Sequence, residues 1–345
     1  MAARLPSDLL KRSAEEGARL VALTYLDEIT RSERRLADPA DSEALHDFRV
    51  GLRRLRSCIK AYRGPLKGSV SKKVRRQLRE FTVETNAGRD AEVQLGWLRG
   101  RVGQLGAGDT EGLAWLVGRL EGRQYEVNLR VASELGQRFE GVAVKLRSRL
   151  ETVRIVIRTG HRQARSTFGQ VTGELICSQV EQLSEKLKAM RGAEGMTEAH
   201  EARIAGKRLR YLMEPLLRRV PSVKSLVSRL KRLQDNLGDL HDTQVLTQEV
   251  ASSLVTLEGL VPPPRILPGL RLLRSLAQES SDASLSAFRT NWSAGKAARF
   301  LSRADDVGRA LQQSDNSPPA RLGPQPMVGN NGAGRHSGSR VLSVG

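Results

Sequence analysis

Two stretches of the chain share a histidine that is followed by arginine and lysine at matching positions. HDFRVGLRRLR begins at His46, and HEARIAGKRLR begins at His200. The cations recur at steps of three and four residues, which places them on one face of a helix. Rows of guanidinium and ammonium groups bind anions, and an arginine can hold two phosphate oxygens at once. The spacing therefore predicts two anion-binding helices.

Each of these helices also carries an apolar stripe beside the basic one. At about 100° per residue, the apolar side chains gather on a neighbouring face. They are Phe48, Leu52, Leu55 and Ile59 in the first copy and Ala202, Leu209, Met213 and Leu216 in the second. We expect each helix to pack this face into a core, which fixes the direction of the basic face.

A basic stripe has two explanations, a solvated surface or a binding site. Like charges at these spacings repel one another on an isolated helix, and no acidic residue lies between them on that face within either motif. For a single stripe, solvation is the simpler explanation. The chain has only five histidines, yet two of them occupy equivalent first positions. The duplication therefore favours an external anion.

The composition points to the same kind of partner. The 345 residues carry a formal net charge of +19, which favours nucleic acid, an anionic membrane or a phosphate polymer, with solubility as the simpler alternative. The two cysteines indicate a reducing compartment without disulfides. No apolar run reaches the length of a membrane span, and the first twenty residues lack the apolar centre of a signal peptide. We expect a cytoplasmic protein with no membrane partner.

Apolar periodicity predicts an all-α fold. A first helix is expected to be capped at Ser7, and only ETVRIVIRT near residue 155 carries a strand signal. From about residue 314 the chain is rich in Pro, Gly, Asn and Ser, so residues 313–345 are predicted to be a disordered tail.

The duplication extends beyond the two motifs. His46 and His200 are 154 residues apart, and residues 78–93 match 230–245 at an offset of 152. At this second offset Lys72 matches Lys224 and Arg79 matches Lys231; a period this long is too large for a solenoid. We expect one helical repeat at about 8–135 and another at about 160–312, folded as two similar bundles that face each other in one globule.

The longer motifs HDFRVGLRRLRSCIKAYR and HEARIAGKRLRYLMEPL resemble the two signature helices of the CHAD family, and NAGRDAEV and LGDLHDTQV are similar to its Leu-Gly-x-x-Arg-Asp element. The resemblance covers residues 8–312. It implies two antiparallel helical bundles around a basic central cleft or pore, and the binding of inorganic polyphosphate, in some members on polyphosphate granules. The chain departs at Thr85-Asn86, where Leu-Gly is usual, and at His241, where Arg is usual.

Polyphosphate is a flexible string of charged tetrahedra, so its binder needs cations spread along a groove, and histidine adds a donor whose charge responds to pH. The expected primary contacts are His46, Arg49, Arg53, Arg56, His200, Arg203, Lys207 and Arg210, with Lys72, Arg79, Lys224 and Lys231 on neighbouring helices. Arg54 and Arg208 lie off the stripe and are second choices. Asp90 and Asp242 either orient cations or serve as helix caps and salt-bridge partners. No metal or cofactor is expected.

Two other function classes compete with this one. The charge would also hold DNA or RNA, but aromatic residues make up only 4% of the chain, which is poor for base stacking. We therefore expect nucleic-acid binding to be incidental. His46-Asp47 and His241-Asp242 resemble one part of a metal-dependent phosphohydrolase signature, but its further ligands are lacking, as is a glycine-rich phosphate loop. The sequence favours a binding protein over an enzyme.

Overall fold

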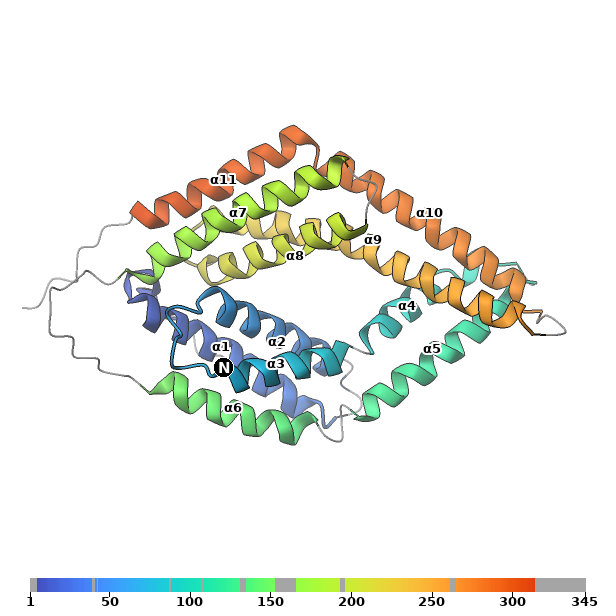
Figure 1. Cartoon of the computed structure of the whole chain (residues 1–345), viewed down its shortest axis with the longest axis horizontal. Helices are drawn as coiled ribbons and strands as arrows, with labels where there is room; N and C mark the ends of the chain where they lie inside the picture. The colour runs from blue at the N-terminus through green and yellow to red at the C-terminus, as the bar shows by residue number, and fades with distance from the viewer. Residues whose placement is uncertain are drawn as a thin grey trace, which may run out of the picture. The chain divides into compact units, whose positions relative to one another are not determined.

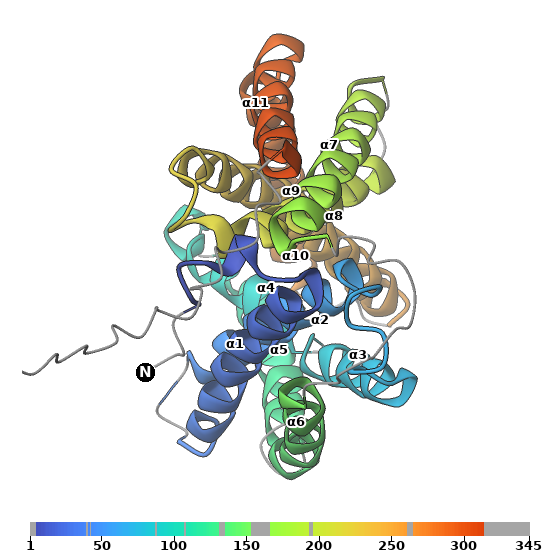
Figure 2. The same ribbon diagram turned by 90° about the vertical axis from the view of Figure 1, so that its left-hand side faces the viewer.

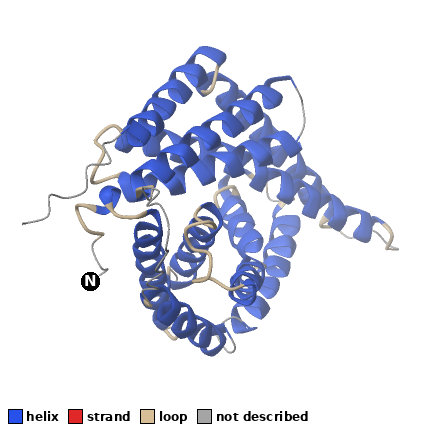
Figure 3. Ribbon diagram, turned by 60° about the vertical axis from the view of Figure 1, so that its left-hand side comes forward, coloured by secondary structure: helices blue, strands red, loops and turns tan. Residues whose placement is uncertain are grey.

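The computed structural model describes residues 5–38, 41, 43–86, 88–106, 108–130, 135–152, 166–192, 196–260 and 265–313. Every regular element in these ranges is helical (Figures 1 and 3), so the all-α prediction is confirmed. The helices are α1 (Ala14–Arg35), α2 (Ala44–Ala61), α3 (Lys72–Asn86), α4 (Arg89–Arg99), α5 (Thr110–Arg130), α6 (Gly136–Glu151), α7 (Phe168–Gly192), α8 (Met196–Met213), α9 (Val223–Glu258), α10 (Leu267–Asn291) and α11 (Ala294–Gln313), with 3-10 turns at Leu9–Lys11, Val102–Gln104 and Glu214–Leu216.

The first helix begins later than the sequence suggested. Ser13, and not Ser7, is the N-cap of α1, and its Oγ accepts a hydrogen bond from the Glu16 amide at 3.2 Å. Glu15 and Glu16 place negative charge in the first turn, which stabilises this end of the helix. The predicted cap at Ser7 is wrong. Most of ETVRIVIRT and the predicted tail lie outside the described residues, so both expectations stay predictions.

The two halves of the chain repeat one order of helix contacts. In the first half α2 packs on α1 and α3, and α6 packs on α1; in the second half α8 packs on α7 and α9, and α11 packs on α7. The single 36-residue α9 takes the place that α3 and α4 share in the first half. Figure 2 shows α1, α2, α3 and α6 grouped below α7, α8, α9 and α11.

The buried apolar residues form two clusters, and each cluster draws on both halves. The first combines side chains of α1, α2, α3 and α6 with those of α7, α8, α9 and α11. The second combines α4 and α5 with the C-terminal part of α9 and with α10. The cores therefore do not divide at the boundary between the repeats. They join the halves, and in doing so they bring α2 and α8 into contact.

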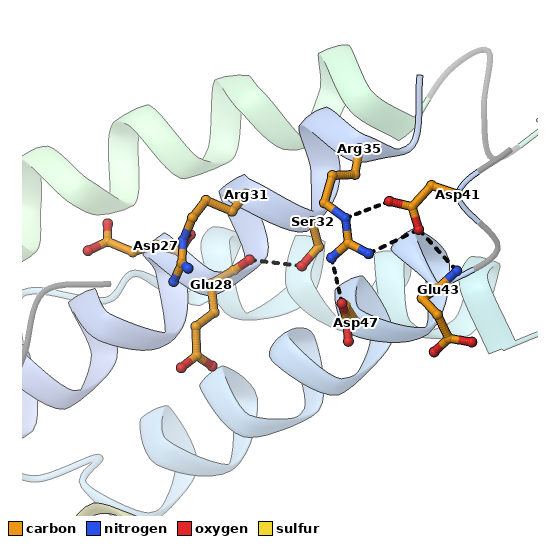
Figure 4. Close-up of polar contacts among 8 residues, drawn as sticks. All are labelled: Asp27, Glu28, Arg31, Ser32, Arg35, Asp41, Glu43 and Asp47. Atoms are coloured by element: carbon orange, nitrogen blue, oxygen red, sulfur yellow. Dashed lines mark hydrogen bonds and ion pairs between the residues drawn. The ribbon is translucent and has the colours of Figure 1, made fainter. Parts of the chain in front are cut away.

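An arginine clamp sets the turn between α1 and α2. Arg35, in the last turn of α1, donates two hydrogen bonds to Asp41, at 2.7 and 3.0 Å, and one to Asp47 in the first turn of α2, at 2.5 Å (Figure 4). The hydrogen bonds to Asp41 and Asp47 raise the pKa of Arg35 above its ordinary value. Asp41 Oδ1 also accepts from the Glu43 amide at 3.2 Å. The clamp fixes the start of the helix that carries the first motif.

The second cluster depends on a close approach of α5 and α10. A Cβ added at Gly112 would lie 2.6 Å from the Ile266 carbonyl oxygen and 2.7 Å from the Leu270 nitrogen. A Cβ added at Gly269 would collide with the Asp109 carbonyl oxygen. These atoms belong to the backbone and cannot swing away, so glycine is required at the contact.

We therefore expect Gly112→Ala to lower the free energy of unfolding by about 1–3 kcal/mol, the usual cost of overpacking. Gly118→Ala is the matched control, because Gly118 lies on the same helix with no atom within 4 Å of an added Cβ. That substitution should stabilise the protein by about 0.5–1 kcal/mol through helix propensity. Denaturant unfolding of both variants measures the difference, and equal effects would contradict the close approach.

Candidate anion-binding groove

A groove of about 790 Å³ lies between α2, α3, α7 and α8. Eight cationic side chains line it, namely Arg53, Arg56, Lys60, Arg63, Arg75, Arg79, Lys207 and Arg208. None of the described residues that line it is a carboxylate. The remaining polar lining consists of serine, glutamine and tyrosine side chains, which can donate hydrogen bonds to an anion. The groove can hold a multiply charged anion.

Two equivalent residues of the repeat lie near each other in the groove lining. Arg53 follows His46 by seven residues, and Lys207 follows His200 by seven. Burial, together with the positive charges of Arg203, Arg53 and Arg210, lowers the pKa of Lys207 to about 7. Arg53 has a buried Nε without a hydrogen-bond partner. Two crowded cations therefore meet where α2 and α8 pack together.

Four of the twelve predicted residues line the groove: Arg53, Arg56, Arg79 and Lys207. Of the other four cations that line it, Lys60 continues the basic stripe of α2, and Arg208 was a second choice. Sequence reasoning missed Arg63 and Arg75. Arg75 precedes Arg79 by one helical turn, so the sequence spacing could have placed it on the same helix face as Arg79. Arg63 follows the end of α2, where a helical projection has no meaning.

Arg49 is buried, and its guanidinium forms its hydrogen bonds within the protein. Its side chain is 3% exposed, and its Nε donates to the Thr85 carbonyl oxygen at 2.7 Å. Its Nη1 donates to Glu92 Oε2, also at 2.7 Å. Arg49 therefore joins α2 to the end of α3 and to α4, although the sequence predicted it as a ligand contact. The carbonyl that it holds belongs to Thr85, one of the two residues that depart from the family element.

A half-buried carboxylate forms ion pairs with two further arginines. Glu214 lies 2.9 Å from Arg54 Nε and 3.3 Å from Arg210 Nε, and Arg54 also lies 3.5 Å from Glu28. The Arg210 guanidinium lies over the ring of Tyr211 at 4.9 Å. Arg54 and Arg210 thus connect α1 and α2 to the end of α8. Arg210 does not line the groove.

Arg203 lies next to the groove and faces a carboxylate of α9. Burial lowers the pKa of Arg203, and the charge of Asp242 opposes this change. Burial also raises the pKa of Asp242, which lies inside α9 and so cannot cap a helix. The role of a cap is therefore excluded for Asp242, whereas its charge acts on the buried Arg203. Asp90 lies in the first turn of α4, where negative charge stabilises a helix.

The other five predicted residues do not line the groove. They are His46, Lys72, His200, Lys224 and Lys231. The His200 ring lies 5.6 Å from the ring of His241, between centroids, at the junction of α8 and α9. Burial lowers the pKa of His241, and Arg203 lowers it further. Lys72, Lys224 and Lys231 are exposed on α3 and α9.

Residues 21–251 match the family model of the CHAD domain. The chain belongs to the CHAD domain family. Its fold is similar to the crystal structure of the CHAD domain from the plant Ricinus communis, with a TM-score of 0.64 and 19% identity over 85% of this chain and 95% of that one. It is also similar to PptA from Streptomyces chartreusis, with a TM-score of 0.61 and 17% identity over 83% of this chain and 98% of that one. No match was found among curated proteins.

Two further features bear on function. Within the described residues, no three His, Cys, Asp or Glu side chains gather in a group that could hold a metal ion. In the same part of the CHAD chain, no helix combines the length and the apolar character needed to cross a membrane.

The low pKa of Lys207 makes the stability of the protein depend on pH. Its pKa falls from an ordinary value of 10.5 to about 7, so between these values the unfolded chain binds more protons than the native one. Stability therefore rises with pH across this window, and the cost of the buried charge is fully present below it. We expect Lys207→Met to raise the free energy of unfolding by about 1–4 kcal/mol at neutral pH and below.

The same substitution should reduce the rise in stability between pH 7 and 10.5. Lys188→Met, at an exposed lysine of α7, is the control and should leave that rise unchanged. Unfolding by denaturant across this range measures both effects. If the free energy of unfolding depended on pH identically in wild type and Lys207→Met, the pKa of Lys207 would not be lowered in the native protein.

Proposed function

We propose that this CHAD-family chain binds inorganic polyphosphate, or a closely similar phosphate polyanion, through the groove between α2, α3, α7 and α8, without catalysing a reaction on it. The observation that carries the proposal is the lining of the groove, where eight cations meet no carboxylate among the described residues. Crowding of this kind is unfavourable in the free protein, and a polyanion relieves it.

The chemistry of the lining suits a chain of phosphates. Six of the eight cations, Arg53, Arg56, Arg63, Arg75, Arg79 and Arg208, are arginines, and a guanidinium can donate two parallel hydrogen bonds to one phosphate group. The lysines Lys60 and Lys207 add compact charges. The cations come from α2, α3, α8 and the turn after α2, so an extended ligand can contact several of them at once.

Nucleic acid is the weaker candidate. Single-stranded DNA and RNA binders use exposed aromatic rings on which bases stack. The aromatic residues that line the groove, Tyr62 and Tyr211, are both buried, and Tyr62 donates or accepts a hydrogen bond with Thr172 at 2.8 Å. A base-free polyanion needs no such ring. The groove therefore supports polyphosphate over a nucleic acid.

Binding without catalysis accords with the positions of the acidic residues. Asp47, next to His46, is held by Arg35, and Asp242, next to His241, faces Arg203. Neither histidine lines the groove, and no carboxylate lines it within the described residues. We also propose that the protein works in the cytoplasm, as its two cysteines indicate, and associates with polyphosphate granules, as the family resemblance implies.

A competition assay at fixed salt tests the proposal. Long polyphosphate, short polyphosphate, DNA and RNA would compete for the wild-type protein at equal concentrations of phosphate. We expect long polyphosphate to bind most tightly, because it has no bases to accommodate and can reach several cations. Equal or tighter binding of DNA or RNA would overturn the proposal in favour of a nucleic-acid-binding protein.

A groove variant locates the site in the same assay. Arg53→Gln, Arg56→Gln and Lys207→Met together should lower the affinity for polyphosphate at least about 100-fold, through the loss of three charged contacts. The matched control removes the same charge from exposed α10 and nearby positions, as Arg265→Gln, Arg274→Gln and Arg289→Gln. Equal losses from the two variants would indicate diffuse attraction and no groove site.

A further inference from the structure

A second group of arginines lies away from the groove lining, where α9 packs on α11. It consists of Arg229 and Arg232 on α9 and of Arg299 and Arg303 on α11, and we call it the α9–α11 arginine surface. Steps of three and four residues separate the arginines within each helix, so each pair lies on one helix face. No groove-lining residue belongs to this surface.

Neutral groups of the protein hold two of these arginines in place. Arg229 Nη2 donates to the Asn291 carbonyl oxygen at 3.1 Å, and the guanidinium lies 5.0 Å from the centre of the Trp292 ring. Arg303 Nη2 lies 3.3 Å from Ser225 Oγ, to which it donates a hydrogen bond. These contacts position the guanidinium groups without neutralising their charge. The surface is therefore preorganised for an anion.

The arginines of this surface crowd one another, and the acidic side chain of Asp306 lines a pocket with Arg303 but forms no ion pair with it. Burial lowers the pKa of Arg229, and the charges of Arg232, Arg299 and Arg303 lower it further. Arg229 Nε is buried without a hydrogen-bond partner. Within the described residues, none of the four arginines forms an ion pair with a carboxylate. Three like charges acting on the buried Arg229 are unfavourable until an anion offsets them.

The first half of the chain supplies an internal comparison. There α3 packs on α6 as α9 packs on α11. At the offset of 152, Arg232 matches Glu80 and Asn236 matches Glu84. Glu84 forms a two-pronged ion pair with Arg138 of α6, with both hydrogen bonds at 3.0 Å. The first half thus has carboxylates at this face, whereas the second half has an arginine and an amide.

We propose that the α9–α11 arginine surface is a second phosphate-binding site, which holds a stretch of polyphosphate in addition to the one in the groove. The choice of ligand rests on the proposed function of the groove. The aromatic residues beside the surface, Trp292 and Phe300, are 2% and 3% exposed, so no ring there is free to stack on a base. The surface therefore suits a chain of phosphates better than DNA or RNA.

Two sites on one protein give long chains an advantage that short chains lack. A polyphosphate long enough to reach both sites binds the second one at high effective concentration, and separate long chains can be joined by one protein. A short chain occupies one site at a time. The two-site arrangement predicts an affinity that increases with chain length beyond the length that fills the groove.

The experiment starts from the full chain with the groove disabled by Arg53→Gln, Arg56→Gln and Lys207→Met. This variant should keep a weaker affinity for long polyphosphate, supplied by the α9–α11 arginine surface. Adding Arg232→Gln, Arg299→Gln and Arg303→Gln should lower that remaining affinity by about tenfold or more. Arg229 stays unchanged because it packs on Trp292, so the added variant should keep the melting temperature of its parent.

The charge-matched control adds Arg265→Gln, Arg274→Gln and Arg289→Gln to the groove variant instead, and should cost much less affinity. Equal losses from the two additions, or a surface that prefers DNA or RNA to polyphosphate, would overturn the second site. This failure differs from that of the proposed function, which fails when the groove variant binds polyphosphate as tightly as wild type. With an intact groove, the surface substitutions should reduce the preference for long chains.

Discussion

The architecture depends on the contact between two basic helices, α2 and α8, which the core holds together against the repulsion of their charges. Leu52, Leu55 and Leu209 are completely buried on the apolar sides of these helices. Each such burial contributes about 2 kcal/mol, whereas two like charges at about 4 Å repel by about 1–4 kcal/mol outside a dry interior. A few leucines therefore outweigh the repulsion, and the basic faces have to lie near each other. The groove is the consequence.

Carboxylates from other helices neutralise only part of this charge, and they do so unequally in the two halves. Arg54 is held by Glu214, while its equivalent Arg208 lines the groove. The reverse holds two residues further along, where Arg56 lines the groove and its equivalent Arg210 forms an ion pair with Glu214. Equivalent arginines of the two halves therefore differ in role, according to whether the half-buried Glu214 pairs with them or they line the groove.

The sequence predicted the elements that local spacing determines. Periodicity placed the apolar and basic faces of both motif helices, and the equivalent residues Arg53 and Lys207 were two of the twelve predicted contacts, four of which line the groove. Periodicity could not reveal that Arg49 is buried against Glu92, because these residues are distant in the chain and meet only through the packing of α2 on α3 and α4. The sequence did not predict the α9–α11 arginine surface for the same reason, since this surface depends on which two helices become neighbours.

Proton uptake on binding tests most directly whether a phosphate polyanion occupies the groove beside Lys207. In the free protein Lys207 has a pKa of about 7, so most of it is neutral at about pH 8. A bound polyanion reverses the local potential and restores the charge. Calorimetric titration with polyphosphate in buffers of different ionisation enthalpy should show an uptake approaching about one proton at about pH 8, and Lys207→Met should lose most of it. Tight binding with no proton uptake, or with the same uptake in both proteins, would contradict the account.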